Sequence, residues 1–282
     1  MSKIRLQQFI IIGVILLILG FIYSRDITAL KPEENKTAGM EANTTPEADE
    51  LNLDDISRVG KNIVGGLYSK EIEALENKFK TSKGESRLEL AAQLADKWND
   101  VEQLTPSALY LEIVASEKNS LNDWINSGDR LIAAFENESD SVVKPALLIK
   151  ANTAFSKALA IDSTNLDAKT GMGTTIVNGM GAPMEGIFML VDVVKKDPKN
   201  LKAIMQLGLF SVKSGQFDRA IERFKEAIKL KETSEAYFYL ATAYENLNRK
   251  EEAIEAYLNS KRIAANPTLS KFIDKKVAEL KN

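Results

Sequence analysis

The chain has 282 residues, of which 44% are apolar and 27% charged, and its formal net charge is −3 at neutral pH. It contains neither cysteine nor histidine, which excludes disulfides, Ser-His-Asp and Cys-His catalysis, and the usual nitrogen and sulfur ligands of zinc. Since no basic surplus is available to neutralise a duplex, we expect no nucleic-acid partner. We also expect no cofactor and no metal.

The first predicted element is an uncharged, mostly apolar segment over Leu6–Ser24, preceded by Lys3 and Arg5. A helix of this length spans about 28 Å, close to the thickness of a bilayer's hydrocarbon core. Residues 1–24 are therefore predicted to be a cytoplasmic N-terminus and a transmembrane signal-anchor, with the remaining chain exported by the positive-inside rule. A cleaved signal peptide is the alternative, but small residues are lacking at the expected cleavage positions.

Residues 25–52 are predicted to be a flexible acidic linker. The central stretch reads KPEENKTAGMEANTTPEADE and has two prolines and no aromatic residue. A segment of this composition buries too little apolar surface to order itself. We therefore expect a tether between the anchor and the folded part of the chain.

Residues 53–161 are predicted to form degenerate helical hairpins, because their apolar positions recur at helical spacing. The first helix opens at Asp54 and is expected to be interrupted or bent near Gly65. Thr105 is expected to cap a later helix with Pro106 at its first position, and Ser120 to cap the next. No segment shows convincing strand alternation, so the predicted fold class is all-α.

Three pairs of small residues recur at one register between residues 162 and 266. Members of a pair are twelve residues apart, and successive pairs follow after 34 and 33 residues. Small residues let two helices cross at about 8 to 10 Å, so each pair predicts a packed hairpin. The pairs are Thr174 with Gly186, Gly208 with Ala220, and Ala241 with Ala253.

Each pair encloses a residue that tolerates a positive φ and precedes a large apolar residue that would fill the space toward the next hairpin. The predicted turn residues are Gly181, Gly215 and Asn248, and the large residues are Leu190, Phe224 and Tyr257. The predicted N-caps are Asn165, Asn200 and Thr233 or Ser234. Residues 267–282 are predicted to be an amphipathic capping helix that covers the last hairpin.

These residues resemble the tetratricopeptide repeat (TPR) family, whose 34-residue unit has this small, small, aromatic, small pattern. The resemblance is strongest in the units that begin at Ala203 and Ala236, is looser from Asp167 to Pro198, and leaves a half-unit at Ala151–Ala158. Upstream of about residue 145 the register is lost. The resemblance implies a TPR-like α-solenoid of antiparallel helix hairpins.

In TPR proteins the first helix of each hairpin, helix A, lines an inner surface that commonly holds a peptide or helix. The resemblance implies a largely apolar groove, which fits an amphipathic helix or extended apolar segment better than an acidic tail. Coverage of the groove by neighbouring helices is the alternative. The predicted groove residues are Asn178, Lys202, Met205, Leu209, Phe238, Thr242 and Glu245.

The chain is similar to membrane-anchored TPR proteins of bacterial envelopes. The resemblance implies a non-enzymatic scaffold, adaptor or assembly factor in the bacterial cytoplasmic (inner) membrane, with its C-terminal domain in the periplasm. Alternatives within this class are a chaperone-like helper at the translocon or in cytochrome c maturation. A structural homo-oligomer is a further, less favoured alternative. A carboxylate-dependent enzyme using residues 51–161 is also less favoured, because no polar cluster converges in the sequence.

Two further patterns have ordinary explanations. The glycines around Gly171 lack the third glycine and the Lys-Ser/Thr ending of a phosphate loop, and they indicate close helix packing instead. Four methionines in the same region are predicted to fill gaps in the core rather than to form an adaptable binding surface. They are Met172, Met180, Met184 and Met189.

Overall fold

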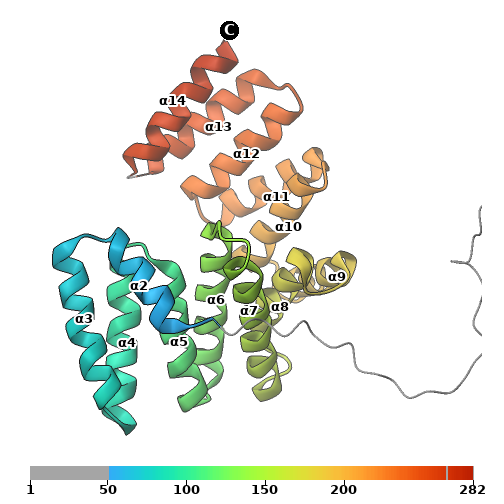
Figure 1. The fold of residues 1–282 in the computed structure, drawn as a ribbon. Helices are drawn as coiled ribbons and strands as arrows, with labels where there is room; N and C mark the ends of the chain where they lie inside the picture. The colour runs from blue at the N-terminus through green and yellow to red at the C-terminus, as the bar shows by residue number, and fades with distance from the viewer. Residues whose placement is uncertain (1–50, 265, 282) are drawn as a thin grey trace, which may run out of the picture. The chain divides into compact units, whose positions relative to one another are not determined.

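A computed structural model describes residues 51–264 and 266–281 (Figure 1), and within these residues the chain is all-α. The predicted anchor over residues 1–24 and nearly all of the predicted linker over residues 25–52 lie outside the described residues. Among the described helices, none combines the length and apolar character that crossing a membrane requires. The helices are α2 (Leu53–Ile63), α3 (Gly66–Thr81), α4 (Gly84–Asp100), α5 (Leu104–Lys118), α6 (Leu121–Asn137), α7 (Val143–Ile161), α8 (Leu166–Thr175), α9 (Pro183–Lys196), α10 (Leu201–Lys213), α11 (Phe217–Leu230), α12 (Ser234–Asn246), α13 (Lys250–Ile263) and α14 (Pro267–Lys281).

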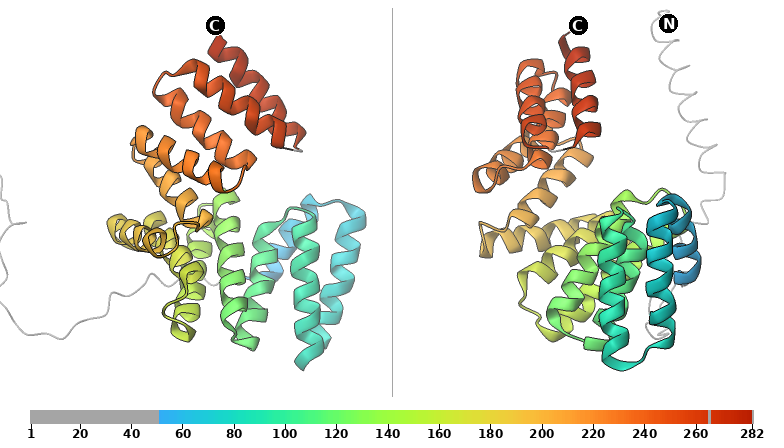
Figure 2. Two further views of the ribbon diagram at one scale, coloured as in Figure 1. Left: turned by 180° about the vertical axis from the view of Figure 1, so that it is seen from behind. Right: turned by 90° about the vertical axis from the view of Figure 1, so that its left-hand side faces the viewer.

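From α3 onward each helix packs against the next, and Figure 2 shows successive helices lying side by side. A second set of contacts joins alternate helices, from α6 to α8, from α8 to α10 and from α10 to α12. Helices α8, α10 and α12 are therefore the A helices of stacked hairpins, and α6 precedes them in the same row. Helices α9, α11 and α13 are their B partners.

Helix α2 lies across α3 and α5 rather than on the row of A helices (Figure 1). Its first turn is capped by Asn52, whose Oδ1 accepts hydrogen bonds from the backbone nitrogens of Asp54 and Asp55. The predicted interruption is confirmed, because α2 ends at Ile63 and Gly65 has a φ of 81° before α3 begins. A residue without a Cβ adopts this conformation at little cost.

Most predicted helix caps are confirmed. The side chains of Ser120, Asn165, Asn200 and Thr233 each accept a hydrogen bond from a backbone nitrogen three residues later. The prediction for Thr105 is wrong: α5 begins at Leu104, and the Thr105 hydroxyl instead donates to a carboxylate oxygen of Glu138 at 3.0 Å. The Thr105 hydroxyl is therefore engaged in a tertiary contact and does not cap α5.

Two of the three predicted turn residues are confirmed, since Gly215 has a φ of 72° and Asn248 a φ of 56°. The third prediction is wrong, because Gly181 has an extended φ of 169° and the positive φ of 135° belongs to Gly179. The reason is local: α8 ends in a π-helical turn, Ile176–Met180, which moves the chain reversal toward the N-terminus.

The predicted large residues all lie in the core, with Leu190 and Phe224 fully buried and Tyr257 1% exposed. A Cβ on Gly208 would lie 2.6 Å from the ring of Phe224, so the small residue of helix A faces the large residue of helix B. The ring of Phe155 on α7 faces Gly128 on α6 in the same way. The hairpin contact therefore continues upstream of residue 145, although the sequence register is lost there.

The C-terminal helix α14 is amphipathic as predicted, with Ile273 and Val277 buried against α12 and α13. The methionine prediction is wrong for Met184, whereas Met172 packs against a core cluster and Met180 and Met189 are half-buried. Met184 on α9 has 55% of its surface exposed, and its neighbour on that helix, Phe188, has 66% exposed. Helix α9 buries Gly186, Leu190 and Val193 instead.

Candidate functional site

The residues predicted to form the groove lie on α10, α12 and the end of α8, and we call their common surface the A-helix face. Leu209 and Phe238 are half-buried, whereas Met205 is only 9% exposed and belongs to the core. The face is therefore shallower at Met205 than the sequence predicts. Its members are Asn178, Lys202, Met205, Leu209, Phe238, Thr242 and Glu245.

One margin of the A-helix face is joined to α6. The Lys202 ammonium forms an ion pair with Asp129, and it also lies 5.7 Å from the centre of the Phe155 ring. Burial raises the pKa of the Asp129 carboxyl, and the Lys202 charge opposes that rise. The sequence could not indicate this pair, because the two residues are 73 positions apart.

Asn178 and Thr242 use their polar atoms within the protein. The Asn178 amide donates to the carbonyl of Thr174 at 2.9 Å and its oxygen accepts from Lys213 at 2.9 Å, which links α8 to α10. The Thr242 hydroxyl donates to the carbonyl of Phe238 in its own helix. These two side chains stabilise the face and leave the apolar residues as its accessible part.

The far end of the face is partly covered by α14. The ring of Phe238 packs against three aromatic rings, among them Phe272 of α14 with ring centres 6.0 Å apart. Glu245 accepts a hydrogen bond from Tyr257 at 2.7 Å and pairs with Lys276 of α14 at 2.8 Å. Helix α14 therefore limits how far a bound segment could extend along α12.

Two carboxylates flank the apolar part of the face, Glu136 at the end of α6 and Glu235 at the start of α12. Both side chains reach solvent, yet neighbouring protein partly desolvates them and raises the pKa of each. The negative charge of Glu235 raises the pKa of Glu136 further, against the lowering effect of lysines on α7 and α10. The same two charges, after desolvation, raise the pKa of Tyr239. Glu136 was not among the predicted groove residues.

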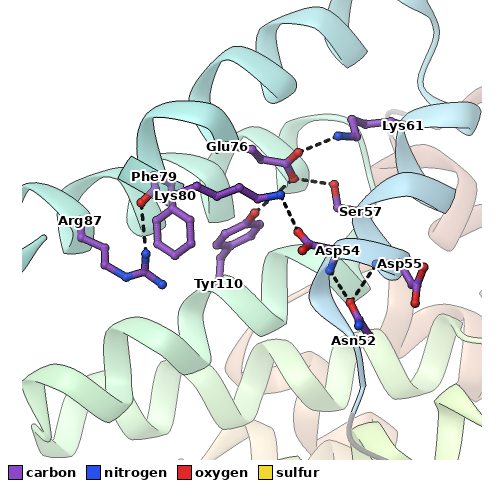
Figure 3. A network of polar contacts seen from close by, with 10 residues as sticks. All are labelled: Asn52, Asp54, Asp55, Ser57, Lys61, Glu76, Phe79, Lys80, Arg87 and Tyr110. Carbon is purple, nitrogen blue, oxygen red and sulfur yellow. Dashed lines mark hydrogen bonds and ion pairs between the residues drawn. The ribbon is translucent and has the colours of Figure 1, made fainter. Parts of the chain in front are cut away.

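A separate polar network joins α2 to α3 and α5 (Figure 3), and sequence reasoning missed it. At its centre is Glu76, a buried carboxylate with 5% exposure. One oxygen accepts hydrogen bonds from the hydroxyls of Ser57 at 2.5 Å and Tyr110 at 3.1 Å, and the other accepts from the Lys61 ammonium at 2.7 Å. Burial, followed by the nearby Glu76 charge, raises the pKa of the Tyr110 phenol. Both oxygens of this buried carboxylate accept hydrogen bonds, which favours a structural role.

Neither region resembles a catalytic or metal centre in the part of the chain that the structure describes. No group of three or more acidic residues there could hold a metal ion. The Glu76 carboxylate is engaged on both oxygens, and Glu245 of the A-helix face is engaged by Tyr257 and Lys276. What the A-helix face offers is an apolar surface with charged margins.

Comparison with known proteins agrees with this architecture. Residues 207–267 match the family described as tetratricopeptide repeat. A TPR protein from Parabacteroides merdae is similar with a TM-score of 0.57, at 13% identity over 83% of this chain and 86% of that one. A thermophilic TPR protein from Thermus thermophilus gives 0.55, at 17% identity over 68% of this chain and 98% of that one. The type IV pilus biogenesis factor PilW gives 0.51, at 17% identity over 68% of this chain and 85% of that one. No curated protein sequence matches the chain.

The described body is therefore an all-α solenoid of stacked helix hairpins. Its C-terminal hairpins are tetratricopeptide repeats, as the sequence pattern predicts.

Proposed function

We propose that the protein is a non-enzymatic scaffold, adaptor or assembly factor that binds a segment of another protein on its A-helix face. The observation that carries the proposal is the partly exposed apolar surface of Leu209 and Phe238 between charged margins, on the row of helices that α2 leaves uncovered. An amphipathic helix or an extended apolar segment fits such a surface, because apolar anchors supply affinity and the margins fix orientation.

The proposal also places this face outside the cytoplasmic membrane of a bacterium. Leu6–Ser24 would be the single-pass anchor and residues 25–52 the tether that holds the repeats away from the bilayer. Support comes from the two basic residues before the apolar segment and from the acidic composition of the tether. The periplasm would then be the compartment in which the partner is met.

The binding surface is tested by site-specific photocrosslinking in cells that express the full chain. A photoreactive residue at Leu209 should give a discrete adduct with a partner protein. The matched control is the same residue at Leu258, which lies on the B helix α13 and is 46% exposed. Met205 is unsuitable for such a test because a change at its buried position would disturb the core.

An adduct from Leu209 that is absent from Leu258 supports binding at the A-helix face. Equal adducts from both positions, or none from Leu209, would contradict binding at the A-helix face. The partner segment is then mapped by mass spectrometry of the crosslinked peptide, which should be apolar on one side.

Topology is tested separately by a reporter fused after Asn282. A reporter that is active only after export should be active, and a reporter that is active only in the cytoplasm should be silent. The reverse pattern would contradict the proposed location, but it would leave the proposal of the binding surface unaffected.

A further inference from the structure

A pocket of about 550 Å³ lies between α2, the start of α5 and the turn from α6 to α7. This volume falls within the range of pockets that bind small ligands or single anchoring side chains. The pocket shares no residue with the A-helix face. Its lining comprises Ile56, Val59, Gly60, Ile63, Asn99, Glu102, Gln103, Leu104, Thr105, Pro106, Ala134, Asn137, Glu138, Asp140 and Val143.

Exposed apolar side chains line this pocket or adjoin its lining in the sequence. Val59 is 52% exposed and Ile63 is 65% exposed on α2, and Val142 is 59% exposed beside the lining residue Val143. Single exposed apolar residues are ordinary on a protein surface. Several that gather around one cavity indicate a binding surface.

Helix α2 packs against the core through Leu53 and, at its end, Val64, and it carries further apolar residues on its outward face. It docks through Ser57 and Lys61, whose polar atoms bind the buried Glu76 (Figure 3), and it presents Val59 and Ile63 outward. Two residues along a helix correspond to a rotation of about 200°, so these pairs lie on opposite faces. An ordinary surface helix has only the core-facing apolar stripe, so Val59 and Ile63 are apolar surface that the packing of α2 does not require.

The network around Glu76 also fixes the position of this apolar face. Gly60 lets α2 approach the Trp98 ring, since a Cβ there would lie 2.9 Å from a ring carbon. A pre-positioned helix loses little conformational entropy when a partner binds. The exposed face of α2 is thus a rigid surface.

The charged residues of the lining are all acidic, namely Glu102, Glu138 and Asp140, and no lysine or arginine lines the pocket. Hydrogen bonds from the backbone nitrogens of Val143 and Val142 hold the pKa of Asp140 below its usual range. Its charge therefore persists at neutral pH. Positive charge on a partner would complement this rim.

We propose that the pocket and the outward face of α2 form a second protein-docking site, whose occupant is a basic amphipathic helix. An apolar side chain of that helix enters between Ile63 and Val143, and its lysines or arginines face Glu102, Glu138 and Asp140. A second copy of this chain fits poorly, because an isologous contact would bring two acidic rims together.

The test uses the full chain in phosphatidylcholine nanodiscs and two labelled synthetic peptides of equal length. One peptide is an amphipathic helix of leucine and lysine, and the other replaces every lysine with glutamate. Fluorescence anisotropy, corrected with empty nanodiscs, should show binding of the lysine peptide and none of the glutamate peptide. The double variant Val59→Gln, Ile63→Gln should weaken the lysine peptide about tenfold.

The matched control is Met184→Gln with Phe188→Gln on α9, where the two side chains are 55% and 66% exposed. It should bind the lysine peptide as the wild type does. Glu102→Lys should weaken that peptide and favour its glutamate counterpart. Equal binding of both peptides, absence of binding, or equal loss in the α9 control would each overturn the proposal. A wild-type dimer that Val59→Gln, Ile63→Gln dissociates would assign the surface to a second copy, and would overturn it as well.

Discussion

Gly128 on α6 faces the ring of Phe155 on α7 so closely that a Cβ at Gly128 would lie 2.6 Å from the Cζ atom. Gly208 stands in the same relation to Phe224, with a Cβ contact of 2.6 Å. The first pair is 27 residues apart and the second is 16 residues apart. The α6–α7 hairpin therefore keeps the contact of the repeats while its helices are longer.

An alanine at Gly128 or Gly208 should destabilise the protein by about 1 to 3 kcal/mol, because the ring has to move within a packed core. Urea unfolding followed by circular dichroism measures this change. Gly66→Ala is the control, since a Cβ there would meet nothing within 4 Å. Similar unfolding midpoints for Gly128→Ala and Gly66→Ala would show that the contact at α6 is loose.

Prediction from the sequence succeeded where the interactions are short in range. Caps such as Asn165 and Asn200 and turns such as Gly215 depend on residues a few positions away, so they could be predicted. Helical hairpins were predicted over residues 53–161, but the contact of Gly128 with Phe155 was missed because the repeat pattern requires constant spacing. The glycine–aromatic contact is present in the structure at Gly128, but its two residues are further apart in the sequence than in the repeats.

Tertiary contacts account for the remaining misses. Glu76 binds Ser57 and Tyr110 at separations of 19 and 34 residues, and nothing in the spacing of these residue types indicates a common centre. The predicted groove residues Lys202 and Glu245 are polar as expected, but their ion pairs with α6 and α14 depend on how distant helices pack. Which part of the A-helix face is accessible therefore depends on the packing of distant helices, which the sequence pattern does not specify.

The two glycines of the turn between α8 and α9 should respond differently to substitution. Gly179→Ala should destabilise by about 1 to 2 kcal/mol, because a φ of 135° is strained for any residue with a Cβ. Gly181→Ala should cost less, since its φ of 169° is ordinary extended backbone and its nearest contact is a side-chain methyl at 3.1 Å. Thermal unfolding of both variants gives the comparison. A larger loss of stability for Gly181→Ala than for Gly179→Ala would indicate that the positive φ belongs to Gly181, as the sequence pattern predicts.

Removal of the Glu76 carboxylate should loosen α2 selectively. Glu76→Ala leaves the Ser57 and Tyr110 hydroxyls and the Lys61 ammonium without their acceptor, and about 2 to 4 kcal/mol of stability should be lost. Hydrogen exchange should accelerate first in α2. For comparison, Asp54→Asn removes an exposed pair with Lys80 and should cost less than about 1 kcal/mol. Unchanged exchange in α2 of Glu76→Ala would mean that apolar packing alone holds this helix.

Neutralising Glu136 should raise the melting temperature at neutral pH. Desolvation and the Glu235 charge raise the folded-state pKa of Glu136 above its unfolded value, so the folded chain binds the proton more tightly. Stability then falls as the pH rises from the unfolded pKa through the folded one, and the penalty is fully present above both. Glu136→Gln removes this penalty, and its advantage over the wild type should disappear below the ordinary glutamate pKa of about 4.3.

Glu252 is the control of opposite sign, because a hydrogen bond from Arg249 lowers its pKa. A lowered folded-state pKa contributes stability above the unfolded value, and this stability is lost as the pH falls through the folded one. Glu252→Gln should therefore melt at or slightly below the wild-type temperature at neutral pH. If Glu136→Gln also melts lower at neutral pH, the positive charges around Glu136 outweigh its desolvation. The Glu136 carboxylate would then stabilise the folded protein through the lysines of α7 and α10.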